Sequence, residues 1–111
     1  MPKPIKITFL SNEKLLFLEF DSNEEAKLSA EFLRVHSPSA EVQGHHPDQA
    51  ILVTGKENVS IDHIESVGNY AIKIFFNDGH DTGIFTWDYL YYLSENYDIL
   101  WREYLAKIKK D

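Results

Sequence analysis

The sequence predicts an α+β fold, in which two β-hairpins are each followed by a capped helix and a mostly antiparallel sheet carries a C-terminal helix. Three observations predict it. A strand–turn–strand pattern occurs in both halves of the chain, a hydroxyl residue able to cap a helix follows each pattern, and apolar residues at helical spacing occupy the C-terminal end. We expect residues 1–111 to form a single domain, since roughly 100–200 residues make one domain.

Residues 67–93 hold the clearest pattern. Ala71–Phe76 is rich in β-branched and aromatic residues, which favour a strand. Asn77-Asp78-Gly79 supplies residues that tolerate the positive φ angles of a tight turn, and residues 82–85 then form a short returning strand. Thr86 follows as the predicted cap of a helix.

The first half of the chain repeats this order. Leu15–Phe20 is predicted as a strand, residues 21–23 as a turn and residues 24–28 as a returning strand, with Ser29 as the helix cap. A competing interpretation starts from Ser22-x-x-Glu25, a capping box, and makes residues 24–35 one continuous helix. We favour the hairpin because it matches the second half position by position.

The remaining segments give weaker signals. Residues 35–47 contain Pro and Gly without a clear period and indicate an ordered loop. Residues 50–53 and 59–64 are apolar enough for short strands. Near the C-terminus the spacing of the large side chains predicts a helix that packs an aromatic stripe on the domain; they are Tyr97, Leu100, Trp101, Tyr104, Leu105 and Ile108.

Composition excludes several classes of function. The chain has no cysteine, which rules out disulfides, thiolate metal sites and a cysteine nucleophile. A formal net charge of −7 argues against binding to nucleic acid or to an anionic membrane surface. There is no apolar run of signal-peptide or membrane-spanning length, so we expect a cytoplasmic protein.

Three motifs in order carry a resemblance to a known family. They are LRVHSPSAEVQGH at residues 33–45, VGNYA at 67–71 and DGHDTGIFTWDYL at 78–90. Together they resemble the gamma-butyrobetaine hydroxylase N-terminal-domain-like family, and the match runs over most of the chain. The resemblance implies a small bacterial domain without an assigned activity. Its relatives precede the catalytic domain of carnitine-pathway dioxygenases or are fused to Mrp-type iron–sulfur carrier ATPases.

In the dioxygenases the resemblance implies a structural zinc site, whose positions correspond here to Ser37, Ser39, Val42 and His80. Hydroxyls and a valine cannot replace thiolates around zinc, so we expect no zinc here and no resident cofactor. An alternative is an N/O site for iron or another divalent ion. Its candidate ligands are His80 with the loop histidines His36, His45 and His46, and with Glu41 or Asp81.

The resemblance brings the loop near His80, and we expect a polar notch there. Its predicted members are Arg34, Ser37, Glu41, His45, His80 and Asp81. Arg34 and Glu41 either pair across the loop or offer an anion-recognition point. Irregular polar segments on a rigid scaffold commonly carry recognition.

The sequence therefore predicts a non-catalytic accessory or protein-interaction domain, with a protein partner and, by resemblance, a link to iron–sulfur or dioxygenase-related proteins. The alternative is a metal-binding domain that uses His80 and His45. Dioxygenase activity ranks last. His46-Pro47-Asp48 matches half of an iron triad, but the chain lacks the strands of the catalytic barrel.

Overall fold

Alternating apolar residues build six strands in the part of the chain that the computed structural model describes, residues 2–39 and 53–109. They form two antiparallel sheets, one in the order β1 (Pro4–Leu10), β2 (Leu15–Phe20) and β3 (Glu25–Ser29). The other has the order β4 (Ile61–Val67), β5 (Ala71–Phe76) and β6 (Ile84–Thr86). The α+β fold class is thereby confirmed.

One face of each sheet supplies the core. Leu16 lies opposite Leu28 across the β2–β3 pair, and Ile72 lies opposite Phe85 across the β5–β6 pair. All four side chains are buried and belong to one hydrophobic cluster. Because side chains alternate along a strand, the residues between them point to the opposite face of the sheet.

Each hairpin leads directly into a helix, as predicted. The helix α1 (Ala30–Val35) begins after Ser29, whose side chain accepts a hydrogen bond from the N–H of Phe32 at 3.0 Å. The helix α3 (Trp87–Glu95) begins after Thr86, which accepts from the N–H of Tyr89 at 3.1 Å. The alternative of one helix over residues 24–35 is wrong, because strand pairing buries Leu28 against β2 and outweighs the local capping-box signal.

The two halves also share hydrogen bonds at positions 56 or 57 residues apart. Phe20 N–H donates to Glu24 O, and Phe76 N–H donates to His80 O, at 2.9 and 3.0 Å. The left-handed turn residue is Asn23 (φ 72°) in one hairpin and Gly79 (φ 93°) in the other. The register of β1 against β2 shifts at the same place as that of β4 against β5. The strand–turn–strand–cap order that the sequence repeats is therefore also repeated in the backbone structure.

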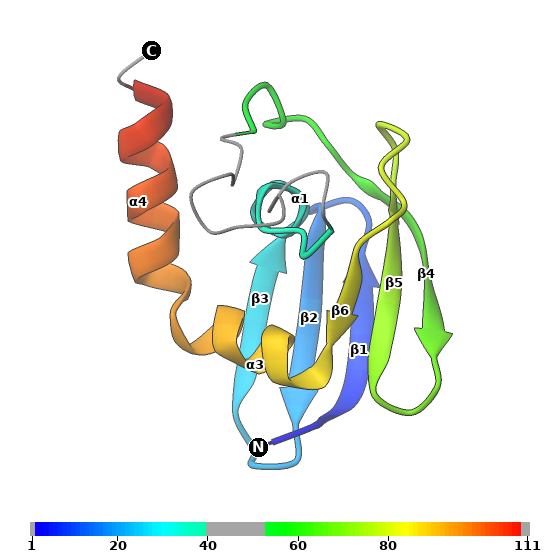
Figure 1. Cartoon of the computed structure of the whole chain (residues 1–111). Coiled ribbons are helices and arrows are strands. Elements are labelled where there is room, and N and C mark those ends of the chain that lie inside the picture. The colour runs from blue at the N-terminus through cyan, green and yellow to red at the C-terminus, as the bar shows by residue number, and fades with distance from the viewer. Residues whose placement is uncertain (1, 40–52, 110–111) are drawn as a thin grey trace.

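The C-terminal helices pack on the core that the two sheets form. Leu90 and Leu93 of α3 lie in the core, and Figure 1 shows α3 crossing in front of β2 and β3. The helix α4 (Tyr97–Lys109) places the rings of Tyr97 and Trp101 against Phe32, with centroids 4.7 and 6.3 Å away. The predicted aromatic stripe thus packs on the domain. Within the described ranges, no helix combines the length and apolar character needed to cross a membrane.

Several segments differ from the sequence predictions, including the returning strand predicted at residues 82–85, which is β6 at Ile84–Thr86. No strand was predicted for residues 4–10, where β1 forms, and the strand predicted at 59–64 is β4, shifted to Ile61–Val67. Of the strand predicted at 50–53 only Val53 is described, and it is not in a strand. Residues 40–47 of the predicted loop lie outside the described residues.

Candidate functional site

A buried hydrogen bond joins the end of α1 to the β5–β6 hairpin. Ser37 Oγ and His80 Nε2 are 2.8 Å apart, and the two residues are 0% and 5% exposed. Gly83 lies directly against this pair, since a Cβ added at Gly83 would collide with Ser37 Oγ. The absence of a side chain at Gly83 is what allows the hairpin and Ser37 to approach.

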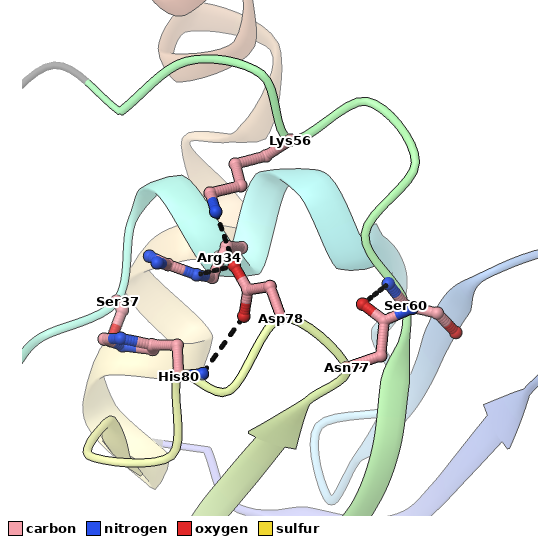
Figure 2. A network of polar contacts seen from close by, with 7 residues as sticks. All are labelled: Arg34, Ser37, Lys56, Ser60, Asn77, Asp78 and His80. Atoms are coloured by element: carbon pink, nitrogen blue, oxygen red, sulfur yellow. Dashed lines mark hydrogen bonds and ion pairs between the residues drawn. The ribbon is translucent and has the colours of Figure 1, made fainter.

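A cluster of three charged residues, which we call the Asp78 ion cluster, lies beside this bond. Arg34 Nε and Lys56 Nζ both contact Asp78 Oδ2, at 2.8 and 2.7 Å. The other oxygen, Oδ1, accepts from the N–H of His80 at 3.1 Å. Figure 2 shows that Asp78 is contacted by Arg34 from α1 and by Lys56 from the segment before β4. One carboxylate thus ties three parts of the chain together.

The pKa of Asp78 reflects these contacts. Burial raises it, but hydrogen bonds from Lys56, from the N–H of His80 and from Arg34 outweigh burial and lower the pKa to about 2. Asp78 is therefore ionised at neutral pH, and its single negative charge faces two positive ones.

The segment that leads from α1 into Ser37 is held by α3. The hydroxyl of Tyr89 donates to the backbone oxygen of His36 at 2.6 Å, and burial raises the pKa of Tyr89 to about 12. The His36 ring makes a 2.9 Å contact with Phe32 O, and burial lowers the pKa of His36. Both groups brace the chain rather than offer free acid–base chemistry.

The structure brings some of the predicted notch residues together. Arg34, Ser37 and His80 lie at one place, and Asp81 is exposed on the adjoining hairpin. Glu41 and His45, together with Val42 and His46, lie outside the described residues. Sequence reasoning missed Lys56 and Gly83 and read Asp78 only as a turn residue. Asp78 could have been found from its position two residues before His80, the histidine that the sequence analysis selected as a candidate site residue.

Comparisons with known proteins identify the family. The family model for gamma-butyrobetaine hydroxylase-like, N-terminal, matches residues 7–91, which is more than half of the chain. This chain belongs to that family. The comparison with curated proteins gives no match.

Solved structures of related proteins share the fold. Two solution NMR structures are 49% and 45% identical, each with a TM-score of 0.84. The first match covers 98% of this chain and 86% of that one, and the second covers 99% and 82%. A crystal structure of a protein of unknown function from Acidithiobacillus ferrooxidans, of the DUF971 family, is 37% identical with a TM-score of 0.70. That match covers 83% of this chain and 92% of the other.

The zinc positions that the family resemblance implies can be tested against the described residues. Ser37, Ser39 and His80 do converge, since the N–H of Ser39 also approaches Ser37 Oγ at 3.4 Å. Neutral hydroxyls do not fit a tetrahedral zinc, and Ser37 Oγ instead forms a hydrogen bond with the imidazole. Among residues 2–39 and 53–109, no group of three His, Asp or Glu side chains is placed to hold a metal ion.

Proposed function

We propose that this chain is a non-catalytic accessory domain that binds a protein partner through the exposed hairpin turn at residues 77–82. The turn is presented rigidly. Asn77 and Ser60 exchange two hydrogen bonds, at 2.9 and 3.0 Å, and His80 is buried beneath the turn. The flanking residues Gly79 and Asp81 are exposed. A fixed, exposed turn on a rigid scaffold is the observation that carries the proposal, because recognition is commonly built this way.

The Ser37–His80 pair supports a non-catalytic role. A serine hydroxyl bonded to an imidazole resembles a nucleophile with its general base. A nucleophile has to reach the substrate, however, and Ser37 is fully buried with Gly83 packed against its hydroxyl. The pair therefore acts as a brace between α1 and the hairpin.

The cellular context of the proposal rests on the family resemblance. Relatives fused to iron–sulfur carriers or preceding dioxygenase domains point to a partner in iron or iron–sulfur metabolism, in the cytoplasm. The charge of −7 is consistent with a partner that is neither nucleic acid nor a membrane.

The test is quantitative co-purification of the full tagged chain from its native cell after cross-linking. Asp81→Ala changes the exposed turn, and Glu25→Ala is the matched control, because Glu25 occupies the equivalent exposed position 56 residues earlier. We expect Asp81→Ala to deplete a partner that Glu25→Ala retains, with iron–sulfur proteins among the partners. Equal recovery of all partners in both variants refutes the role of the turn.

A further inference from the structure

The repeated architecture places two equivalent helix positions against the turn region of the opposite half. Arg34 near the end of α1 reaches Asp78 in the second hairpin turn at 2.8 Å. Tyr91, the equivalent of Arg34 in α3, reaches Glu24 beside the first hairpin turn at 3.0 Å. In both cases a helix of one half contacts the turn region of the other half.

The two contacts differ in how completely their donors are used. Tyr91 has one O–H, which it donates to Glu24. Arg34 has five N–H groups, and its Nη1 is buried without any hydrogen-bond partner, the one such side-chain atom found in residues 2–39 and 53–109. Since a tyrosine satisfies the same architecture elsewhere, the surplus donor of Arg34 is not required by the fold.

The local charge points to the kind of ligand that would use this donor. Arg34 and Lys56 share the single carboxylate of Asp78, so the Asp78 ion cluster carries one surplus positive charge in a chain of net charge −7. Figure 2 shows the terminal nitrogens of Arg34 directed away from Asp78. The Lys56 and Asp78 side chains remain 23% and 19% exposed, so the cluster lies at the surface.

We propose that Arg34 and Lys56 form a binding site for an oxyanion, a carboxylate or a phosphate group. The guanidinium supplies the planar pair of donors that such groups favour, and Lys56 supplies a mobile ammonium that moves aside to admit the anion and then contacts it. Asp78 holds both cations in place and competes with the ligand for them. The site adjoins the partner-binding turn through Asp78, but its anion donors are Arg34 and Lys56, which lie outside residues 77–82.

The test is titration of the isotopically labelled full chain with inorganic phosphate at constant ionic strength, followed by NMR. We expect saturable shifts of the Arg34 side-chain N–H and of the amides of Asp78 and His80. Lys56→Gln should weaken binding about tenfold, as for the loss of a charge-assisted hydrogen bond. Asp78→Asn should tighten binding, because it removes the competing carboxylate.

Two controls separate this site from general charge effects. Lys73→Gln removes a cation from the other side of the second sheet, and Tyr91→Phe changes the equivalent contact; both should bind phosphate like the parent chain. Shifts that do not saturate, or equal binding by Lys56→Gln and Lys73→Gln, overturn the proposal. Titration with acetate and with a short acidic peptide then tells a free ion from a partner's side chain: tighter binding of the peptide identifies the latter.

Discussion

Replacing Asp78 by asparagine isolates the electrostatic part of the Asp78 ion cluster, because the amide keeps the shape of the carboxylate and removes its charge. Burial raises the pKa of Asp78, but hydrogen bonds from Lys56, His80 and Arg34 lower it to about 2, against an ordinary 3.8. At about 1.4 kcal/mol per pH unit this difference is worth at most about 2.5 kcal/mol. Solvent screening at a side chain that is 19% exposed reduces the expected loss to roughly 1–2 kcal/mol.

The pH dependence has a definite sign. The folded chain favours the ionised carboxylate, so its contribution to stability is complete above the unfolded pKa of 3.8 and is lost as the pH falls towards about 2. Asp78→Asn has no such titration. The difference in unfolding free energy between the parent and the variant should therefore be roughly 1–2 kcal/mol at neutral pH and should shrink towards zero near pH 2.

Urea unfolding followed by circular dichroism across this pH range measures the difference. Asp81→Asn serves as the matched control, since Asp81 is an exposed carboxylate on the same turn and should change stability by less than about 0.5 kcal/mol. A loss at neutral pH no larger than that of Asp81→Asn would refute the electrostatic reasoning. A difference in unfolding free energy that stays constant down to pH 2 would show that the loss comes from the changed shape of the side chain and not from its charge.

Four further outcomes follow from the packing. Gly83→Ala should lower the unfolding free energy by about 1–3 kcal/mol, because the added methyl collides with Ser37, and an unchanged denaturation midpoint would contradict that contact. Ser37→Ala should cost about 1 kcal/mol by removing the bond to His80, measured the same way. Thr86→Ala should cost about 1 kcal/mol through loss of the cap, as should Ser29→Ala, and a negligible change in both would show that these caps are dispensable. Excess chelator should leave the circular dichroism spectrum unchanged, and elemental analysis should find no stoichiometric metal, since no thiolate site couples folding to metal.

The parts of the fold that the sequence predicted are those with local signals. Ser29 and Thr86 lie where a strand pattern changes to a helix pattern, and a capping hydroxyl acts within three residues of itself. The strand β1 was missed although Ile5, Ile7 and Phe9 alternate there. It begins at Pro4, a residue that disfavours a strand, and its pairing with β2 defines it as a strand.

The candidate site was predicted less completely, because its contacts join distant parts of the chain. Arg34 and Asp78 are 44 residues apart, and Lys56 and Asp78 are 22 apart. No spacing rule links such pairs. The family resemblance placed the loop of residues 37–45 near His80, and of that loop Ser37 Oγ lies 2.8 Å from His80 Nε2, but the resemblance could not indicate that Asp78 contacts both cations.

A comparison of the two halves separates the residues that the backbone geometry requires from the residues that make the two ends of the molecule different. Equivalent positions that keep one role, such as the capping hydroxyls and the left-handed turn residues Asn23 and Gly79, are set by backbone geometry. Arg34 replaces a tyrosine, and His80 replaces Glu24, without any change in that geometry. Selection for the fold alone does not explain a guanidinium whose buried Nη1 has no hydrogen-bond partner, at a position where a tyrosine suffices in the other half. The two halves therefore differ most clearly at the end of the molecule around Arg34 and His80, which is where we propose that binding occurs.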